Sequence, residues 1–272
     1  MKLSQYLSYL QENYFQNRSD AIEFASHISG IAYNKIPLSL SEEIDTLGAE
    51  EKLSEINDEK PLAYVINNKN FYGLDIFVDE SVLIPRPETE ILVDEVIECS
   101  KGRDNLKILD ICTGSGCILT ALLSELSSAT GVGLDISEGA IKTAQKNIDT
   151  YGLTDRCTLL QGDALRISEL NLGTFDIITC NPPYLSETEW LQSGKSLKYE
   201  PKNALSAGDD DLLFYKLLMD IAPDLCHKNC VGAFFELGVG QYEKLASLGL
   251  IENWNVTCDY QQIERVLSWT NL

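Results

Sequence analysis

Short apolar runs alternate with helical stretches along most of this chain, and that alternation is the strongest constraint on its fold. The apolar runs cover residues 106–111, 131–136, 157–163, 175–180, 231–238 and 265–270. Stretches with helical spacing lie between them at 118–126, 138–150, 209–226 and 240–248. Strands that are apolar on both faces and alternate with helices are typical of a parallel sheet covered by helices. We therefore expect an α/β fold from residue 106 onward.

The first 60 or so residues have a different pattern. Apolar residues there recur at helical spacing, as in Leu3, Tyr6, Leu7 and Leu10. Ser41, with Glu42 and Glu43 after it, is typical of a helix start. We expect a small helical bundle that ends at Pro61.

A segment rich in strand-forming residues follows the bundle. Residues 71–85 carry aromatic and β-branched side chains on both sides of Asp79-Glu80-Ser81, which has the composition of a turn. This segment predicts a β-hairpin between the two parts of the chain. Pro85-Arg86-Pro87 and a further helix come next.

Composition limits the possible partners and the compartment. Acidic residues outnumber basic ones by 42 to 21, which gives a net charge of -21, and no basic cluster is visible. Such a chain repels phosphate backbones, so we expect a small molecule or a protein as partner and no direct contact with nucleic acid. No apolar stretch approaches the roughly 20 residues of a membrane span, and the first residues do not form a signal peptide. The eight cysteines form no CxxC pair, so we expect reduced thiols, no metal site and a cytoplasmic protein.

The first candidate for a ligand site is a glycine-containing turn. Cys112-Thr113-Gly114-Ser115-Gly116-Cys117 joins an apolar strand to a helix, and Asp110 at the strand end can fix the turn. Asp135 ends the next strand, where an acid can accept hydrogen bonds from a ribose diol. The glycine spacing suits a nucleoside such as S-adenosylmethionine better than a pyrophosphate, although a tight turn without a ligand remains an alternative. Asp163, with Ala164 after it, ends the third strand and can meet an adenine amino group or can be a surface acid.

The second candidate, Asn181-Pro182-Pro183-Tyr184, directly follows the strand at 175–180. Ligands of open α/β sheets bind at the carboxyl ends of the strands, so this tetrapeptide is expected beside the cofactor turn. Its prolines remove two N–H donors and leave two acceptors, the Asn181 side-chain oxygen and the Pro182 carbonyl. Two acceptors suit a planar NH2 group, and Tyr184 can pack on the flat face of a substrate. The alternative is an ordinary proline turn after a strand.

These residues resemble the amino methyltransferases that act on planar nitrogens. That group includes the adenine methyltransferases of DNA and the glutamine methyltransferases of peptide chain release factors. Several further stretches resemble the second kind: Phe71-Tyr72-Gly73, residues 84–90 with Pro85-Arg86-Pro87-Glu88-Thr89, residues 109–117, and Tyr199-Glu200-Pro201. Cys112 departs from the glycine that is usual in the family.

The resemblance implies a fold, a reaction and a set of site residues. The fold is α/β: a seven-stranded Rossmann-like class I methyltransferase domain at 87–272, preceded by a helical release-factor-docking domain at 1–68 and a β-hairpin linker at 69–86. The implied reaction is methyl transfer from S-adenosylmethionine to the glutamine of a Gly-Gly-Gln loop, by a cytoplasmic enzyme that we expect to be a monomer. The implied cofactor residues are Thr89, Cys112, Thr113, Gly114, Ser115, Gly116, Asp135, Asp163, Ala164 and Asn181. Asn181, Pro182, Pro183 and Tyr184 would hold the glutamine.

Three other interpretations remain open at this point. A nucleic-acid adenine methyltransferase shares the Asn-Pro-Pro-Tyr sequence, but the net charge of -21 opposes it. A cofactor-binding module without activity would be consistent with Cys112. An NAD-dependent oxidoreductase would need a GxGxxG turn, which this chain lacks.

Overall fold

The structure is a computed structural model that describes residues 1–270. The chain forms two compact units. One consists of residues 1–68 and 195–199, and the other of residues 69–194 and those from 200 onward.

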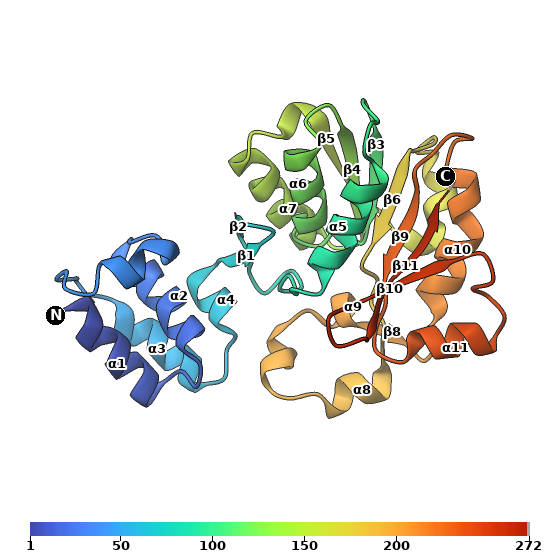
Figure 1. The fold of residues 1–272 in the computed structure, drawn as a ribbon. Helices are drawn as coiled ribbons and strands as arrows, with labels where there is room; N and C mark the ends of the chain where they lie inside the picture. The colour runs from blue at the N-terminus through green and yellow to red at the C-terminus, as the bar shows by residue number, and fades with distance from the viewer. Residues whose placement is uncertain (271–272) are drawn as a thin grey trace. The chain divides into compact units, whose positions relative to one another are not determined.

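The first unit is a bundle of short helices (Figure 1). Its elements are α1 (Leu3–Asn13), α2 (Arg18–Ser29), η1 (Tyr33–Leu38), α3 (Ala49–Asn57), α4 (Leu62–Ile66) and η4 (Ser196–Tyr199). The apolar faces of the elements before residue 68 enclose a core that includes Leu10, Phe24 and Leu53. The Tyr199 hydroxyl donates a hydrogen bond to the Asp58 carbonyl at 3.1 Å, which connects η4 to the end of α3.

The helix start predicted at Ser41 is wrong. Glu43 pairs with Lys2 in an isolated antiparallel bridge, so the backbone around it is extended. The Leu3 N–H donates to the Glu42 carbonyl at 2.9 Å, a pairing that a helix starting at Ser41 would not allow. The next helix, α3, begins instead at Ala49.

The second unit contains a seven-stranded sheet with the strand order β10-β11-β9-β6-β3-β4-β5. The strands are β3 (Lys107–Ile111), β4 (Thr130–Asp135), β5 (Cys157–Gln161), β6 (Ile177–Cys180), β9 (Gly232–Glu236), β10 (Asn255–Cys258) and β11 (Glu264–Thr270). Neighbouring strands from β9 to β5 are parallel, whereas β11 runs antiparallel to both β9 and β10. The α/β fold is therefore confirmed, and β10 is a strand that the apolar pattern did not indicate.

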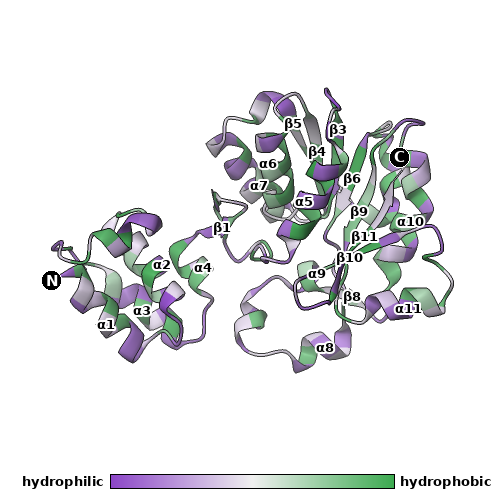
Figure 2. Ribbon diagram, viewed as in Figure 1, coloured by the Kyte–Doolittle hydropathy of each residue, from purple (hydrophilic) through white to green (hydrophobic). Residues whose placement is uncertain are grey.

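Helices cover both faces of this sheet. α5 (Thr89–Cys99), α6 (Cys117–Glu125) and α7 (Glu138–Thr150) lie on one face, and α10 (Leu213–Leu225) and α11 (Gln241–Ser247) lie on the other (Figure 1). Every residue of β6 and β9 is buried, because these strands have helices on both sides. Figure 2 shows the apolar residues concentrated on the strands and on the helix faces turned toward them.

Short elements complete the second unit. They are β1 (Lys69–Phe71), β2 (Leu74–Ile76), η2 (Thr154–Arg156), η3 (Ala164–Leu170), β7 (Leu185–Ser186), α8 (Glu187–Gln192), α9 (Lys202–Leu205) and β8 (Ser206–Gly208). None of the helices in residues 1–270 has both the length and the apolar character that a membrane span requires.

The β-hairpin exists, but its turn was placed wrongly. β1 and β2 pair across Tyr72 and Gly73, which have φ values of 53° and 73°. A two-residue turn with positive φ at both positions matches the twist of the strands that it joins. At the predicted turn, the Asp79 carboxylate accepts a hydrogen bond from the Ser81 N–H at 2.9 Å, and the next element along the chain is the helix α5.

Candidate active site

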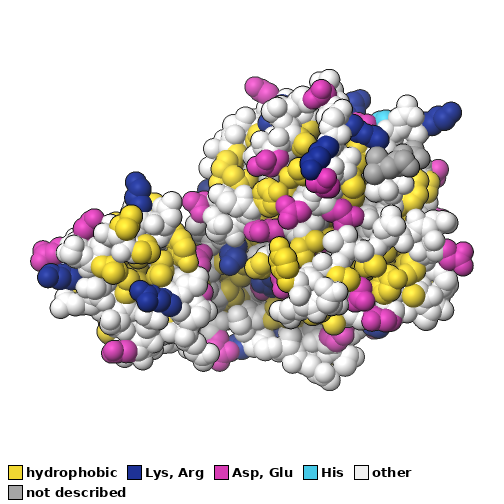
Figure 3. All heavy atoms as spheres, viewed as in Figure 1, with side chains coloured by type: hydrophobic (Ala, Val, Ile, Leu, Met, Phe, Trp, Pro, Cys, Tyr) yellow, Lys and Arg dark blue, Asp and Glu magenta, His cyan; other side chains and the backbone are white. Residues whose placement is uncertain are grey.

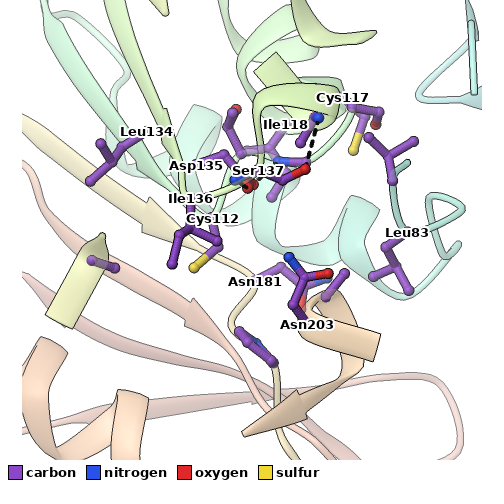
Figure 4. Close-up of a pocket in the computed structure, with 18 of the residues that line it drawn as sticks. Leu83, Cys112, Cys117, Ile118, Leu134, Asp135, Ile136, Ser137, Asn181 and Asn203 are labelled. Carbon is purple, nitrogen blue, oxygen red and sulfur yellow. Dashed lines mark hydrogen bonds between the residues drawn. The ribbon is translucent and has the colours of Figure 1, made fainter. Parts of the chain in front are cut away.

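A pocket opens at the carboxyl ends of β3, β4, β5 and β6, where ligands of α/β sheets bind. The empty space between its lining atoms, counted together with the open mouth, is about 880 Å³. The strand-end segments that line it are residues 112–115, 134–137 and 162–164, together with Asn181 and Pro183. In Figure 4, Leu134 to Ser137 lie along one side of the pocket, and Asn181 and Asn203 lie along the facing side.

The turn after β3 is fixed by hydrogen bonds to the buried carboxylate of Asp110, the residue before the last of β3. Asp110 accepts hydrogen bonds from the Thr113 hydroxyl at 2.6 Å and from the Thr179 hydroxyl at 2.7 Å. Thr179 is the β6 residue opposite Asp110 in the parallel register. Burial raises the pKa of Asp110 to about 6, and the two hydroxyl donors partly oppose that rise. This carboxylate connects the turn to two strands.

The conformation of the turn explains two of its residues. Cys112 has a φ of 59°, in the left-handed region that favours glycine. Gly116 has a φ of 74°, and a Cβ there would lie 3.1 Å from the Ala144 side chain of α7. Gly116 therefore allows α6 and α7 to approach closely and does not itself line the pocket.

Asp135 is fixed by the backbone on both sides. One carboxylate oxygen accepts the Gly114 N–H and the other accepts the Ser137 N–H, both at 2.9 Å. Burial raises its pKa, while these backbone hydrogen bonds act in the opposite direction. Each oxygen retains a lone pair, so the carboxylate can still accept hydrogen bonds from a diol.

The segment after β5 supplies Asp163 and Ala164. The Asp163 side chain accepts the Leu165 N–H at 2.9 Å and caps η3. Ala164 is buried, and both residues line the pocket. The cap keeps the acid at the pocket edge.

Asn181 has one satisfied polar atom and one unsatisfied polar atom. Its Nδ2 atom donates to the hydroxyl of Thr89 at 3.3 Å. Its Oδ1 atom is buried and has no hydrogen-bond partner. Because a buried acceptor without a partner is costly, this oxygen is a strong candidate for contact with a ligand.

The loop that carries Asn181 is fixed at its far end. The Tyr184 N–H donates to the Leu205 carbonyl at 3.1 Å, and the buried Gln241 donates to the Tyr184 carbonyl at 2.8 Å. Gly238 lies against the Tyr184 ring, where a Cβ would come within 2.7 Å of the ring. Burial raises the pKa of Tyr184 to about 12, so its hydroxyl stays protonated at neutral pH. Pro182 and Tyr184 lie outside the pocket lining, whereas Asn181 and Pro183 belong to it.

Sequence reasoning missed residues without a chemical signature. Leu83, Ile136, Ser137, Asn203 and Phe214 line the pocket. The sequence analysis also did not identify Asn147. This buried α7 residue donates a hydrogen bond to the Ser115 carbonyl at 2.8 Å and so supports the turn after β3. The 3.6-residue spacing of α7 could have indicated Asn147, because it is an amide on a helix face whose other buried residues are Ala, Thr and Ile.

The pocket fits S-adenosylmethionine in its shape and charge. Leu134, Ile136 and Ile118 provide apolar surface for a base, and Asp135 provides acceptors for a ribose. Among the described residues of the lining, Asp135 and Asp163 are the charged ones, and no lysine, arginine or histidine is present. A site with this charge favours a sulfonium cation over a pyrophosphate. Residues 1–270 contain no group of three or more side chains arranged to hold a metal ion.

The seven-stranded sheet with its reversed β11, and the pocket at the strand ends, define a class I methyltransferase. A family model described as "Methyltransferase domain" matches residues 103–215. The fold is also similar to the catalytic domain of hMettl16 in complex with an RNA hairpin, with a TM-score of 0.58 and 20% identity over 74% of this chain and 77% of that one. At that identity, the likeness concerns the fold alone.

Curated relatives are closer in sequence. A release factor glutamine methyltransferase of Flavobacterium psychrophilum is 38% identical over 217 residues, which cover 78% of this chain and 74% of the relative. One of Thermodesulfovibrio yellowstonii is 34% identical over 264 residues, which cover 92% and 91%. The chain belongs to the release factor glutamine methyltransferase family. It is a methyltransferase, and S-adenosylmethionine is its methyl donor.

Proposed function

We propose that this enzyme methylates the side-chain amide nitrogen of the glutamine in the Gly-Gly-Gln loop of a peptide chain release factor. The observation that carries the proposal is the unpartnered, buried Oδ1 atom of Asn181 beside the cofactor pocket. The names of the curated relatives support the choice of substrate.

The arrangement of acceptors suits an amide nitrogen. A glutamine NH2 group has two hydrogens, and the Asn181 Oδ1 and the Pro182 carbonyl can each accept one. Bound S-adenosylmethionine supplies the methyl group as an activated sulfonium. The lone pair of an amide nitrogen is delocalised into its carbonyl, so acceptors on both hydrogens increase its electron density and fix its direction of attack. Neither acceptor is a strong base, and none is needed, because the nitrogen becomes acidic once it carries the methyl group and its proton is released to solvent with the product.

The neighbouring residues exclude water and restrict the approach. Pro183 lines the pocket beside Asn181, and the neutral ring of Tyr184 packs against the core at the end of the loop. In a dry site the two acceptor contacts are stronger than they would be in water. In this proposal Asp135 holds the ribose, Asp163 and Ala164 meet the adenine, and Thr89 lies near the methionine end of the cofactor.

The helical unit at residues 1–68 is proposed as the docking surface for the release factor. It has its own apolar core, and it exposes Leu38 and Leu47 almost completely, at 86% and 90%. Figure 3 shows hydrophobic side chains gathered on the visible face of this unit. We propose that the enzyme acts as a monomer on the protein, not on nucleic acid, and in the cytoplasm, where a release factor functions. If so, changing both leucines to serine raises the KM for the factor and leaves cofactor affinity unchanged.

Substitution of Asn181 tests the proposed reaction. Asn181→Ala should abolish methyl transfer to the release factor, because the buried acceptor is lost, while S-adenosylmethionine binding in calorimetry persists. Asn255→Ala, at an exposed position of β10, serves as the control. Near-normal turnover of Asn181→Ala would exclude the amide-holding role of this residue.

A further inference from the structure

Residues 75–81 run antiparallel along helix α7, and every second residue of this segment meets every fourth residue of the helix side. The four pairs are Asp75 with Tyr151, Phe77 with Asn147, Asp79 with Thr143, and Ser81 with Gly139. Two residues of extended chain cover about 6.6 Å and four residues of helix about 6 Å, so the two spacings match. The four helix-side residues form what we call the contact face of α7.

The first two pairs take the place of a neighbouring strand for β2. The Tyr151 hydroxyl accepts the Asp75 N–H at 2.7 Å and donates to the Asp75 carbonyl at 3.2 Å. The Asn147 Oδ1 accepts the Phe77 N–H at 2.8 Å, and its Nδ2 donates to the Phe77 carbonyl at 3.0 Å. Nδ2 also donates to the carbonyl of Ser115, in the turn after β3, at 2.8 Å. Asn147 therefore connects the segment to the cofactor turn.

The last two pairs lie where the segment reaches the pocket. The Thr143 hydroxyl is 3.4 Å from both carboxylate oxygens of Asp79 and 3.1 Å from the Ser81 hydroxyl. A Cβ at Gly139 would lie 2.8 Å from the Ser81 Cβ, which is closer than two such atoms approach in proteins. The absence of a side chain at Gly139 therefore allows the segment to lie directly against the start of α7.

We propose that the contact face of α7 is a positioning surface that fixes residues 81–83 as one wall of the pocket and thereby sets the affinity for S-adenosylmethionine. All three residues line the pocket, and Leu83 lies across it from Leu134 (Figure 4). Dispersion contacts are steep in distance, and a gap of about 0.5–1 Å loses roughly a quarter to a half of the attraction. A small shift of this wall should therefore weaken cofactor binding.

Gly139→Ala tests the close approach. The new methyl group displaces Ser81 and the wall with it, so the Kd for S-adenosylmethionine in calorimetry should rise about tenfold. Gly194→Ala is the matched control and should keep the Kd within about twofold. Gly194 is exposed, and among the described residues no atom beyond its chain neighbours lies within 4 Å of its Cβ position. Alanine favours helix, so a glycine without this role would give a protein of equal or greater stability and unchanged Kd, which would overturn the proposal.

A second substitution should reverse the effect. Ser81→Gly in the Gly139→Ala background removes the Cβ that the new methyl group meets. The Kd should then return to within about threefold of that of the unaltered enzyme. A Kd that stays as high as in Gly139→Ala alone would show that the effect does not pass through Ser81, and would contradict the proposal.

Asn147→Asp tests the connection to the cofactor turn. The variant keeps an acceptor for the Phe77 N–H, but an oxygen now faces the carbonyls of Phe77 and Ser115, so the Kd for S-adenosylmethionine should rise about tenfold. Ile148→Ala, at the next and fully buried position of α7, is the control for lost stability and should keep the Kd within about twofold. Equal Kd values in the two variants would contradict the role of Asn147. If Asn147→Asp does not fold, the Gly139→Ala result decides.

Hydrogen exchange gives a readout without cofactor. The backbone amides of residues 75–83 should exchange faster in Gly139→Ala than in the unaltered enzyme or in Gly194→Ala. A raised Kd with unchanged exchange would overturn the proposal, because the substitution would then reach the pocket by another route. These measurements concern the cofactor alone. A failure to methylate a release factor would overturn the proposed function, and the role of the contact face would still be decided.

Discussion

Glu200 receives a hydrogen bond from the guanidinium of Arg86 at 2.5 Å and another from the Ile84 N–H at 3.0 Å. Glu200 is buried, although it lies more than a hundred residues from both donors along the chain. Its carboxylate therefore connects the segment before α5 to the segment before α9. Pro85, from the first of these segments, and Asn203, in the first turn of α9, line the cofactor pocket.

Removal of Glu200 should destabilise the protein. Glu200→Ala leaves the Ile84 N–H without its partner and the Arg86 charge unpaired, which should lower the free energy of unfolding by about 2–3 kcal/mol. This value lies below the usual range of about 3–5 kcal/mol because the Arg86 side chain is 31% exposed and its charge is partly screened by solvent. Urea unfolding measures the change. Glu187→Ala, which breaks the exposed pair with Lys202, should cost less than about 1 kcal/mol, and an equal loss in the two variants would contradict this interpretation.

Cys112→Gly should tighten cofactor binding. The cysteine lines the pocket and has a φ of 59°, which costs a non-glycine residue about 1–2 kcal/mol. Glycine removes that strain and widens the pocket, while the greater freedom of the unfolded chain offsets part of the gain in stability. Calorimetry should give a lower Kd for S-adenosylmethionine, with little change in the free energy of unfolding. A higher Kd would show that the thiol contributes to binding.

Asp135→Asn should weaken cofactor binding. An asparagine offers one oxygen where Asp135 uses two, which accept the Gly114 and Ser137 N–H groups. We expect a loss of about 1–3 kcal/mol in the binding free energy of S-adenosylmethionine. Asp155→Asn, at an exposed position of η2, is the control. An unaltered Kd in Asp135→Asn would remove this carboxylate from the site.

The pH dependence of stability should contain a contribution from Asp110. Its pKa is about 6 in the folded protein, against an ordinary aspartate value of 3.8, so the folded form binds the proton more tightly than the unfolded chain does. The resulting stabilisation is fully present below the unfolded pKa and is lost as the pH rises through about 6. Between pH 5 and 7.5 this group alone should lower the free energy of unfolding by about 1 kcal/mol. Asp110→Asn removes this titration, so urea unfolding at the two pH values should show a smaller loss; an equal loss in both proteins would contradict the assignment.

The sequence pattern was sufficient for the sheet strands that are buried on both faces. Ile177 to Cys180 and Gly232 to Glu236 are apolar almost throughout, because helices cover both of their sides. β10 escaped prediction because its four residues are half-buried or exposed and carry no apolar run. The hairpin turn was misplaced because Asp79-Glu80-Ser81 has the composition of a turn, whereas Tyr72 is an unusual residue at positive φ.

The pocket residues that lie at the ends of strands could be predicted from the sequence. Gly114, Asp135 and Asn181 each lie at or just after the end of a strand, and the carboxyl ends of parallel strands meet at one edge of the sheet. Asn203 and Phe214 come from segments whose position depends on tertiary contacts, and no spacing in the sequence indicates that they reach the pocket.

Methylation of an intact release factor by the purified enzyme is the most direct test of the proposed function. The enzyme is incubated with radiolabelled S-adenosylmethionine and the factor, in parallel with a factor whose Gly-Gly-Gln glutamine is changed to alanine and with DNA. We expect label in the intact factor and in neither of the other two samples. Equal label in the alanine version would contradict the assignment of the glutamine as the methyl acceptor, and label in DNA would point to an adenine methyltransferase.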